Sequence, residues 1–439
     1  MSASSGPADP PGPEAPAPER PGLRTRVAET AEPLVARAGR ATEQLGARFS
    51  SPLHDEWVAS VLGVALGVAF TACFVTGLVD YLAQHPPGWF HLPVHPINLY
   101  RVNEGVHVIT GIATIPLLLA KLWTVWPKLF SWPPVKGAAQ ALERLSLIPL
   151  VGGSLFLLFT GVVNIDYWYS PMPFFFPTAH FWAAWLVVGA LIVHVGAKAT
   201  TAAGSIARGP GPTPRSRRSP ASPAAGRPGV GSSSDGDERS GLSRRGFIGA
   251  IFGTAGVLVL TVAGETVAPL MRLAVLAPRN PVIGPQRLPV NQSARQAGVT
   301  ASAVDPTYRL VVRGRCARPQ SFTLADLQAM PQRSAGLPIS CVEGWSAGAM
   351  WRGISLPHLL GVVGAPSGAA VRVVSLESQH RLYASSEVDS AHAADPDTLL
   401  ALECNGAPLD LDHGYPLRLI APDRPGVLQT KWITTVVVL

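Results

Sequence analysis

The chain has 439 residues, of which 47% are hydrophobic and 14% are charged, and its formal net charge is +7. This length exceeds one ordinary domain, and so large an apolar share exceeds what a soluble enzyme needs, so we expect a membrane part. The basic residues concentrate in low-complexity stretches between apolar segments and not on one folded face, which argues against a nucleic-acid partner. The four cysteines have irregular spacing, which is typical neither of a disulfide framework nor of a zinc site.

Residues 1–50 are rich in proline, alanine, glycine and charge and have no sustained apolar face. Such a segment cannot bury enough surface to offset the entropy of an ordered chain, so we predict a disordered cytoplasmic tail. It also lacks the short apolar core and the cleavage site of a secretory signal peptide, so we expect no removal of this segment.

Residues 51–199 contain four apolar stretches, each long enough to cross about 30 Å of hydrocarbon as a helix. They are Trp57–Leu82, Val102–Trp126, Leu145–Ile165 and Ala179–Ala199. Between the second and third stretches lie Lys128, Lys136 and Arg144, whereas the connection 164–178 has no lysine or arginine. Because cytoplasmic loops are enriched in these residues, the pattern predicts a multi-pass protein of the cell membrane with a cytoplasmic amino terminus.

Residues 200–242 are dense in proline, glycine, serine and arginine, and we predict a disordered cytoplasmic linker. The segment 243–276 holds a fifth apolar run, Phe247–Ala263, which would carry the chain outward as an anchor helix. It opens with Ser243-Arg244-Arg245-Gly246-Phe247-Ile248, which resembles the twin-arginine signal that exports folded proteins. The alternative is a pair of basic residues that simply obeys the positive-inside rule.

Residues 277–439, which should then lie outside the cytoplasm, change in character. Short β-branched runs such as Tyr308–Val312 and Val371–Leu376 alternate with glycine and proline turns, and helical signals are few and short. The predicted fold is therefore an all-α membrane bundle of four helices and a fifth anchor helix, followed by an α+β, mainly β, domain.

Several histidines lie in or next to the apolar stretches. A polar ring in lipid usually faces the interior of a bundle and has a functional partner there. His180 and His194 lie fourteen residues apart, close to four helical turns, so their rings should face one side about 21 Å apart along the axis. This spacing fits two stacked haems. His107 lies at the depth of His180 and predicts an outer haem, and His54 lies at the depth of His194 and predicts an inner one. A histidine that only bonds a neighbouring helix is the alternative for each.

The depth and spacing of these histidines resemble the four-helix cytochrome b subunits that couple quinones to enzymes outside the membrane, such as that of formate dehydrogenase. The resemblance covers residues 54–199. It implies one haem b or two, with iron ligands among the four histidines, and electron exchange with the quinone pool.

One cysteine stands in the motif Ser340-Cys341-Val342-Glu343-Gly344-Trp345-Ser346. The motif resembles the molybdenum-ligating segment of the sulfite oxidase family. A thiolate on a loop after a short strand suits a soft, high-valent metal, so the resemblance makes Cys341 a catalytic residue and the protein sulfur that ligates molybdenum beside a pterin dithiolene. A buried apolar cysteine is the alternative.

A second motif, His413-Gly414-Tyr415-Pro416-Leu417-Arg418-Leu419, continues to Lys431-Trp432. In the sulfite oxidase family this region holds the pterin phosphate and lines the metal pocket. The resemblance implies that His413, Arg418 and Lys431 contact molybdopterin and that Arg418 is also catalytic, and it adds Asn291 as a cofactor-lining residue. A planar arginine fork and a lysine suit phosphate and oxyanions.

The motifs carry signals for two classes of substrate. The paired arginines that follow the metal cysteine in animal sulfite oxidases are replaced by Glu343-Gly344-Trp345, which is closer to the periplasmic methionine sulfoxide reductases. Against that branch, its basic residue near the position of Leu428 is missing, and His413 resembles the oxidase form. Cys316 and Cys404 could form a disulfide outside the cytoplasm, a pairing that their spacing does not decide.

We therefore expect a molybdopterin-dependent oxidoreductase that exchanges electrons between the quinone pool and an external molybdenum centre through haem b. It should reduce a small sulfoxide-type substrate. The alternatives are oxidation of sulfite or a related anion, with electrons passed inward, and a non-catalytic binding domain on a cytochrome b anchor.

Overall fold

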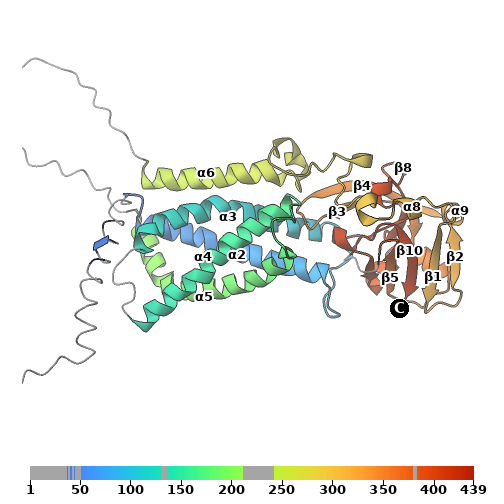
Figure 1. Cartoon of the computed structure of the whole chain (residues 1–439), viewed down its shortest axis with the longest axis horizontal. Coiled ribbons are helices and arrows are strands. Elements are labelled where there is room, and N and C mark those ends of the chain that lie inside the picture. Colours follow the sequence, from blue (N-terminus) through green and yellow to red (C-terminus); the bar gives the residue numbers. More distant parts are fainter. Residues whose placement is uncertain are drawn as a thin grey trace, which may run out of the picture. The chain divides into compact units, whose positions relative to one another are not determined.

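The computed structural model describes residues 51–129, 137–210, 242–378 and 383–439, together with residues 37, 40, 41 and 44. Within these residues, five long helices precede a domain of strands and short helices (Figure 1). The predicted disordered tail 1–50 lies almost wholly outside the described residues, and so does the part 211–241 of the predicted linker.

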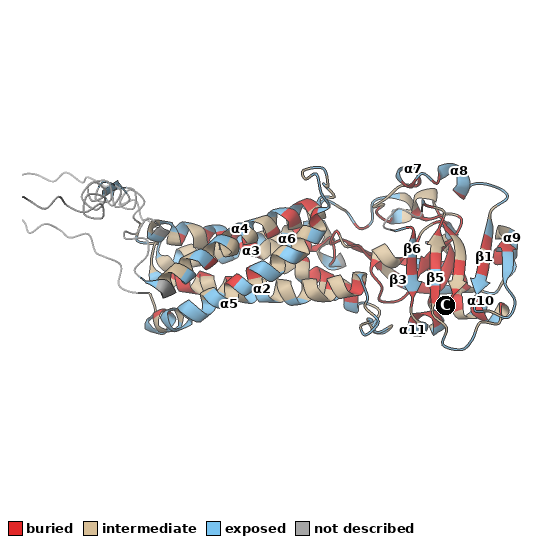
Figure 2. Cartoon of the chain, turned by 60° about the horizontal axis from the view of Figure 1, so that its bottom comes forward, coloured by how far each residue is buried: buried red, intermediate tan, exposed pale blue. Residues whose placement is uncertain are grey.

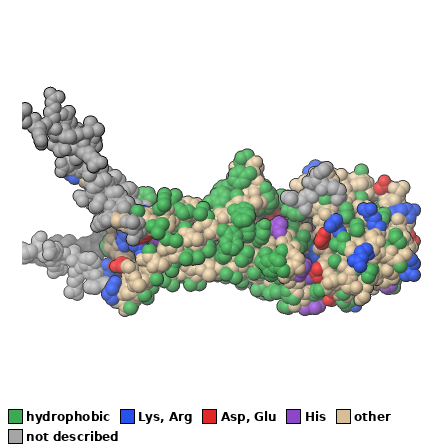
Figure 3. All heavy atoms as spheres, turned by 90° about the horizontal axis from the view of Figure 1, so that it is seen from below, with side chains coloured by type: hydrophobic (Ala, Val, Ile, Leu, Met, Phe, Trp, Pro, Cys, Tyr) green, Lys and Arg blue, Asp and Glu red, His purple; other side chains and the backbone are tan. Residues whose placement is uncertain are grey.

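Each of the five long helices contains one of the predicted apolar stretches and is long and apolar enough to cross a membrane. They are α2 (Glu56–Gln84), α3 (Leu99–Leu129), α4 (Ala138–Ile165), α5 (Phe176–Arg208) and α6 (Arg244–Ala263). Large apolar side chains such as Val68, Trp182 and Ile192 are exposed on them. Figure 3 shows hydrophobic side chains along the middle of the helical part, and charged ones over the β domain and at the opposite end of the helices. This helical part therefore has the length and the surface of a membrane-spanning region.

The boundary between the fourth span and the linker was predicted wrongly. Helix α5 continues to Arg208, so residues 200–208, which we expected to be disordered, are helical. The reason is local: this stretch contains alanines and no proline, and the helix ends only at Gly209, whose φ of 73° suits a residue without a side chain.

Ion pairs between residues near the ends of the long helices show which helix ends are neighbours. Asp55 caps the start of α2 by accepting hydrogen bonds from two backbone amides, and its carboxylate lies 3.3 Å from the guanidinium of Arg244 at the start of α6. Lys198 of α5 and Glu143 of α4 form an ion pair of 2.7 Å. The beginnings of α2 and α6 therefore share one end of the bundle, as the predicted order of membrane crossings requires.

The carboxy-terminal domain is built from two five-stranded sheets. One has the order β2-β1-β10-β5-β6, with β1 and β10 parallel, and the other has the order β3-β4-β7-β8, with β9 paired to β7. The strands of the first sheet are β1 (Arg309–Gly314), β2 (Gln320–Thr323), β5 (Val371–Ser375), β6 (Ser385–Val388) and β10 (Ile433–Val438). Those of the second are β3 (Gln332–Ser340), β4 (Ser346–Ser355), β7 (Leu399–Cys404), β8 (Ala407–Pro408) and β9 (Arg418–Ile420).

In the second sheet, β7 and β9 are buried on both faces, whereas β3 and β4 alternate between buried and exposed residues. Successive residues of β7 alternate between two cores, because Leu400 and Leu402 pack with the first sheet while Leu399 and Ala401 pack beside Cys341. Figure 2 shows most strand residues buried and the short helices α8 (Thr300–Ala303) and α9 (Leu324–Ala329) largely exposed. The domain is mainly β with short helices, as the sequence predicted.

Candidate functional site

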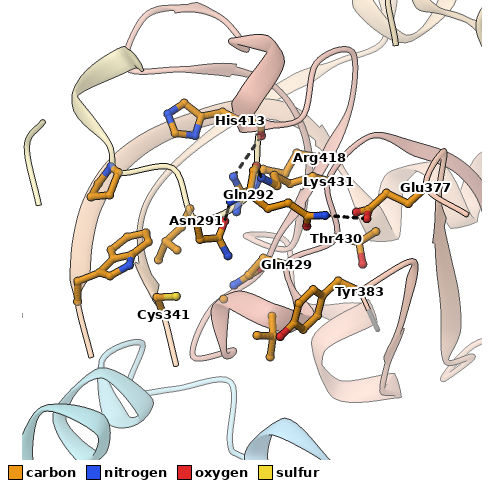
Figure 4. A pocket seen from close by; sticks show the side chains of 15 residues that line it. Asn291, Gln292, Cys341, Glu377, Tyr383, His413, Arg418, Gln429, Thr430 and Lys431 are labelled. Carbon is orange, nitrogen blue, oxygen red and sulfur yellow. Dashed lines mark hydrogen bonds between the residues drawn. The ribbon is translucent and has the colours of Figure 1, made fainter. Parts of the chain in front are cut away.

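A pocket lies in the carboxy-terminal domain, and the empty space in it, including the part open to solvent, is about 570 Å³. It brings together all five residues that the sequence assigned to molybdopterin, which come from four separate segments. The lining residues are Pro289, Asn291, Gln292, Ile339, Cys341, Trp345, Glu377, Tyr383, His413, Arg418, Gly426, Val427, Gln429, Thr430 and Lys431. In Figure 4, Cys341 lies on one side of the pocket and Glu377 on the other, with Arg418 and Lys431 between them.

Cys341 stands on a tight turn between β3 and β4. Its backbone N–H donates to the carbonyl of Trp345 over 2.9 Å, and the N–H of Gly344 donates to the carbonyl of Cys341 over 3.0 Å. Gly344 has a φ of 99°, a conformation that favours glycine. The thiol is 2% exposed, and burial raises its pKa well above the ordinary value, with Glu343 adding to the effect. A bound metal cation would reverse this and hold the thiolate.

His413 and Arg418 are positioned by one turn. His413 ends the short helix η3 (Leu411–His413), and Arg418 begins β9. The carbonyl of His413 accepts a hydrogen bond of 3.1 Å from an Nη1 of Arg418, and Nε2 of His413 lies 2.8 Å from the carbonyl oxygen of Pro285. Between them, Gly414 has a φ of 110°, and a side chain there would lie 3.2 Å from Arg418 and 3.1 Å from Lys431. Glycine at this position thus leaves room for the Cβ atoms of both basic residues.

Lys431 is held by two backbone carbonyls. Its ammonium donates to the backbone carbonyls of Gln292 and Asp412 and lies 4.4 Å from the ring centroid of Trp432. Burial, with the charge of Arg418 as a second cause, lowers its pKa to about 7. Burial likewise lowers the pKa of Arg418 to about 10 and that of His413 to about 4. Two buried cations side by side are costly without an anion between them.

These features fit the phosphate of a pterin cofactor. Nε of Arg418 is buried and has no hydrogen-bond partner among the described residues, so it is available to an added acceptor. A phosphate would also offset the mutual repulsion of Arg418 and Lys431. The roles assigned to Asn291, Cys341, His413, Arg418 and Lys431 stay predictions, but the geometry brings these residues together in one pocket.

Several residues that line the pocket were missed. Gln429 and Thr430 directly precede Lys431-Trp432, so the second motif could have been extended to include them. Glu377 and Tyr383 follow β5 and precede β6, in a segment with no distinctive pattern. Glu377 accepts a hydrogen bond of 3.1 Å from Gln292, which links the far wall of the pocket to the segment of Asn291. Glu377 and Tyr383 could therefore be assigned to the pocket only from the folded structure and not from the sequence.

In the bundle, His107 of α3 and His180 of α5 face each other, with ring centroids 6.5 Å apart. Two imidazoles that bind one iron from opposite sides have centroids about 6 Å apart, because metal–nitrogen bonds are about 2 Å long. Nδ1 of His107 lies 2.9 Å from the carbonyl oxygen of Cys73, and Nδ1 of His180 lies 2.7 Å from Oγ1 of Thr160. Donation from both Nδ1 atoms would leave both Nε2 lone pairs available for a metal.

The second predicted pair is less closely arranged. The ring of His54 packs edge-on against Trp123, with centroids 4.4 Å apart, and the structure gives no contact between His54 and His194 among the described residues. Both ring nitrogens of His54 and Nδ1 of His194 are nevertheless buried without hydrogen-bond partners there. Buried polar atoms of this kind usually have a ligand or water, so both rings are compatible with an added group.

Cys316 and Cys404 are free thiols, so the structure gives no disulfide between them. Each packs with a different hydrophobic cluster of the domain, Cys316 at the edge of the core between the sheets and Cys404 inside the cluster that contains Cys341.

Comparison with known proteins agrees with the geometry. Residues 297–439 match the family described as the oxidoreductase molybdopterin binding domain. A putative protein-methionine-sulfoxide reductase subunit YedZ1 of Azospira oryzae is 34% identical over 127 residues, which cover 29% of this chain and 47% of that protein. The mitochondrial sulfite oxidase of Drosophila melanogaster is 32% identical over 156 residues, 30% of this chain and 27% of that protein.

The chain of a solved structure, the sulfane dehydrogenase SoxCD of Paracoccus pantotrophus, is 23% identical, covers 31% of this chain and 40% of its own length, and has a TM-score of 0.28. The matched segment spans less than half the length of each relative named above. Together with the pocket around Cys341, the family match shows that residues 297–439 form a molybdopterin-binding oxidoreductase domain of the sulfite oxidase type. In the part of the chain that the structure describes, five apolar helices precede this domain.

Proposed function

We propose that this chain is a membrane-bound oxidoreductase in which electrons pass from the quinone pool through haem b to a molybdenum centre outside the cytoplasm, where a small sulfoxide-type substrate is reduced. The observation that carries the proposal is the pair His107 and His180, whose rings stand 6.5 Å apart in a bundle that continues into a molybdopterin domain. A second haem, between His54 and His194, belongs to the same proposal.

When bound, the molybdenum cofactor supplies oxygen-atom transfer coupled to two electrons. The residues of this chain bind and orient it. Cys341 offers the metal a sulfur on a turn fixed by two backbone hydrogen bonds. Arg418 and Lys431 hold the anionic phosphate, and His413, whose pKa is lowered to about 4 by burial, stays neutral at physiological pH and adds no third charge beside them. Trp351, 5.3 Å from the guanidinium of Arg418, limits the movement of that side chain.

The turn that follows Cys341 carries no cation. The residue two positions after the cysteine is Glu343, which is 3% exposed and bonded to the indole N–H of Trp345 over 3.1 Å, and burial raises its pKa. Glu343 therefore provides no positive charge for an anion such as sulfite, in contrast to the paired arginines of animal sulfite oxidases. A sulfoxide carries no net charge and does not require such a cation.

Oxidation of sulfite or a related anion is the second candidate, and the similarity to a mitochondrial sulfite oxidase supports it. The two candidates differ in the direction of electron flow. Purified protein supplied with a reduced dye should consume methionine sulfoxide if the first holds, whereas ferricyanide-dependent oxidation of sulfite would favour the second.

Export by the twin-arginine route is part of the proposal, because a domain that contains a cytoplasmically assembled cofactor must fold before it crosses. Ser243 caps the start of α6 through a hydrogen bond from the N–H of Gly246, so the motif Ser243–Ile248 forms the beginning of this helix. Replacing Arg244 and Arg245 with lysines should leave the carboxy-terminal domain on the cytoplasmic side, which protease accessibility in spheroplasts would report.

The test of the central proposal is metal and optical analysis of purified protein, with a Cys341→Ser variant beside it. We expect about one molybdenum per chain, the single-cofactor stoichiometry of one pocket, and b-type haem bands that dithionite reduces. The variant should keep its haem and show an altered molybdenum EPR signal. Haem without molybdenum in fully matured protein would contradict the enzymatic proposal and leave a cytochrome with a binding domain.

A further inference from the structure

The loop that bears Cys341 contacts three of the long helices or their extensions. Asn164, near the end of α4, donates a hydrogen bond of 2.8 Å to the carbonyl of Val342. Thr266, just after α6, donates one of 2.6 Å to the carbonyl of Gly344. The N–H of Ser346 donates to the carbonyl of Glu265 over 3.0 Å. Three of the loop's backbone polar groups are thus satisfied by the helical part of the chain.

Gly344 also packs closely against α3. A Cβ atom at Gly344 would lie 2.9 Å from Cγ2 of Val108 and 3.8 Å from Cγ1 of Ile165, so glycine permits contact that no other residue would. Val108 and Ile165 are buried there together with Val262 of α6. The contact is apolar and closely packed, which keeps water out of it.

The same stretch of α3 holds the predicted haem ligand. His107 and Val108 are consecutive residues, and their side chains point to different partners: the ring of His107 faces His180, while Val108 contacts Gly344. Gly344 in turn donates its N–H to the carbonyl of Cys341. A path for electrons therefore leads from the imidazole of His107 to Cys341. It contains one through-space step, between Val108 and Gly344, and every other step follows a covalent bond or a hydrogen bond.

We propose that Val108 and Gly344 form the contact through which electrons pass between the bundle and the molybdenum centre, and that Asn164, Glu265 and Thr266 are positioning residues that hold it closed. This inference rests on the proposed function. In each crossing one electron leaves the haem, which is oxidised, and the molybdenum centre gains it and is reduced. The quinol supplies two electrons and releases two protons at its own site.

The test enlarges the contact residue in the full-length, cofactor-loaded protein. Val108→Phe should push the loop away from α3, whereas Ile112→Phe, one helical turn further along and at the edge of the same cluster, is the matched control. Asn164→Ala, which removes a hydrogen bond without adding volume, is the second variant. Deuterium uptake by the peptide 341–346, whose Ser346 amide bonds Glu265, reports whether the loop has opened.

Electron passage is then followed after mixing with duroquinol, by haem absorbance and by the EPR signal of molybdenum in rapidly frozen samples. In Val108→Phe we expect haem reduction at the wild-type rate, a molybdenum signal that appears several-fold more slowly, and faster deuterium uptake by residues 341–346. In Asn164→Ala we expect smaller changes of the same sign in the molybdenum signal and in deuterium uptake. Ile112→Phe should change neither.

Three results would overturn the inference: an open loop with an unchanged molybdenum signal, a loop that stays protected in both test variants, or equal slowing in Ile112→Phe. Wild-type protein whose haem duroquinol does not reduce would instead contradict the proposed function itself. The two failures are therefore distinguishable.

Discussion

Asp423 of the β domain accepts a hydrogen bond of 2.7 Å from the backbone N–H of Tyr100 in the first turn of α3, 323 residues away in the sequence. A carboxylate at a helix start satisfies amides that have no partner within the helix. Helix α3 thus takes an end cap from another part of the chain, and both residues are nearly completely buried.

Removing this cap should loosen the start of α3. Asp423→Asn keeps a residue that tolerates the φ of 46° at this position, while its neutral amide is a weaker acceptor for the helix amides. We expect faster amide exchange of residues 99–103, because a charged acceptor makes the stronger hydrogen bond to these amides. His95→Gln breaks the exposed 3.2 Å pair of His95 with Asp395 and should change exchange little. Equal exchange in wild type and Asp423→Asn would refute the capping role.

The contribution of Asp423 should depend on pH. Burial raises the pKa of this carboxyl from its ordinary value of 3.8 to about 6, so the folded protein holds the proton more tightly than the unfolded chain. The resulting stabilisation is present below pH 3.8 and is lost as the pH rises through about 6. The difference in stability between wild type and Asp423→Asn should therefore shift by about 1–3 kcal/mol against the wild type between pH 4 and 7. Parallel profiles of apparent unfolding temperature would contradict this.

Variants that lack one histidine each should show how many haems the bundle binds. His107→Ala or His180→Ala removes one ligand of the outer pair, and we expect loss of that haem's absorbance and of one step in a redox titration. His54→Ala or His194→Ala should remove the other step if the inner haem exists. His85→Ala, whose ring stacks on Tyr81 at the end of α2, is the control that should keep all haem. Full haem content in His180→Ala would exclude the outer site as proposed.

The Lys431→Met variant should affect two properties that can be measured separately, the affinity for molybdopterin and the stability of the domain. Without its ammonium, the pocket loses a charge-assisted hydrogen bond, so affinity for molybdopterin should fall by about 1.5–3 kcal/mol. The cofactor-free wild-type domain should gain stability as the pH rises from about 7 to 10.5, because burial lowers the pKa of Lys431 to about 7 and the unfolded chain holds its proton more tightly.

The Met variant should show no such gain. Molybdenum content and thermal unfolding across this pH range measure the two effects, with the exposed Arg372→Met as control. A variant that retains wild-type molybdenum content would remove Lys431 from the cofactor site.

Local patterns were enough to predict the five helices, the β domain and the residues that meet in the pocket, since hydropathy and short motifs are properties of contiguous sequence. Other features depend on tertiary contacts. Glu377 and Tyr383 reach the pocket because β5 and β6 pair, and Asp423 caps a helix far away in the sequence. The helical residues 200–208 were missed because serine, threonine and glycine suggested a linker, although only Gly209 ends the helix.

The packing of α6, the last long helix, against α2, the first, has a consequence for the assembly of the protein. Phe247, Ile248 and Ile251 of α6 pack against the cluster that contains Val58 and Leu62 of α2, so the bundle is complete only after the last helix has been made. A chain interrupted before α6 would leave this part of α2 uncovered in the lipid. Only unfinished copies would expose this apolar face of α2, so membrane proteases that recognise loosely packed helices would distinguish them from finished copies.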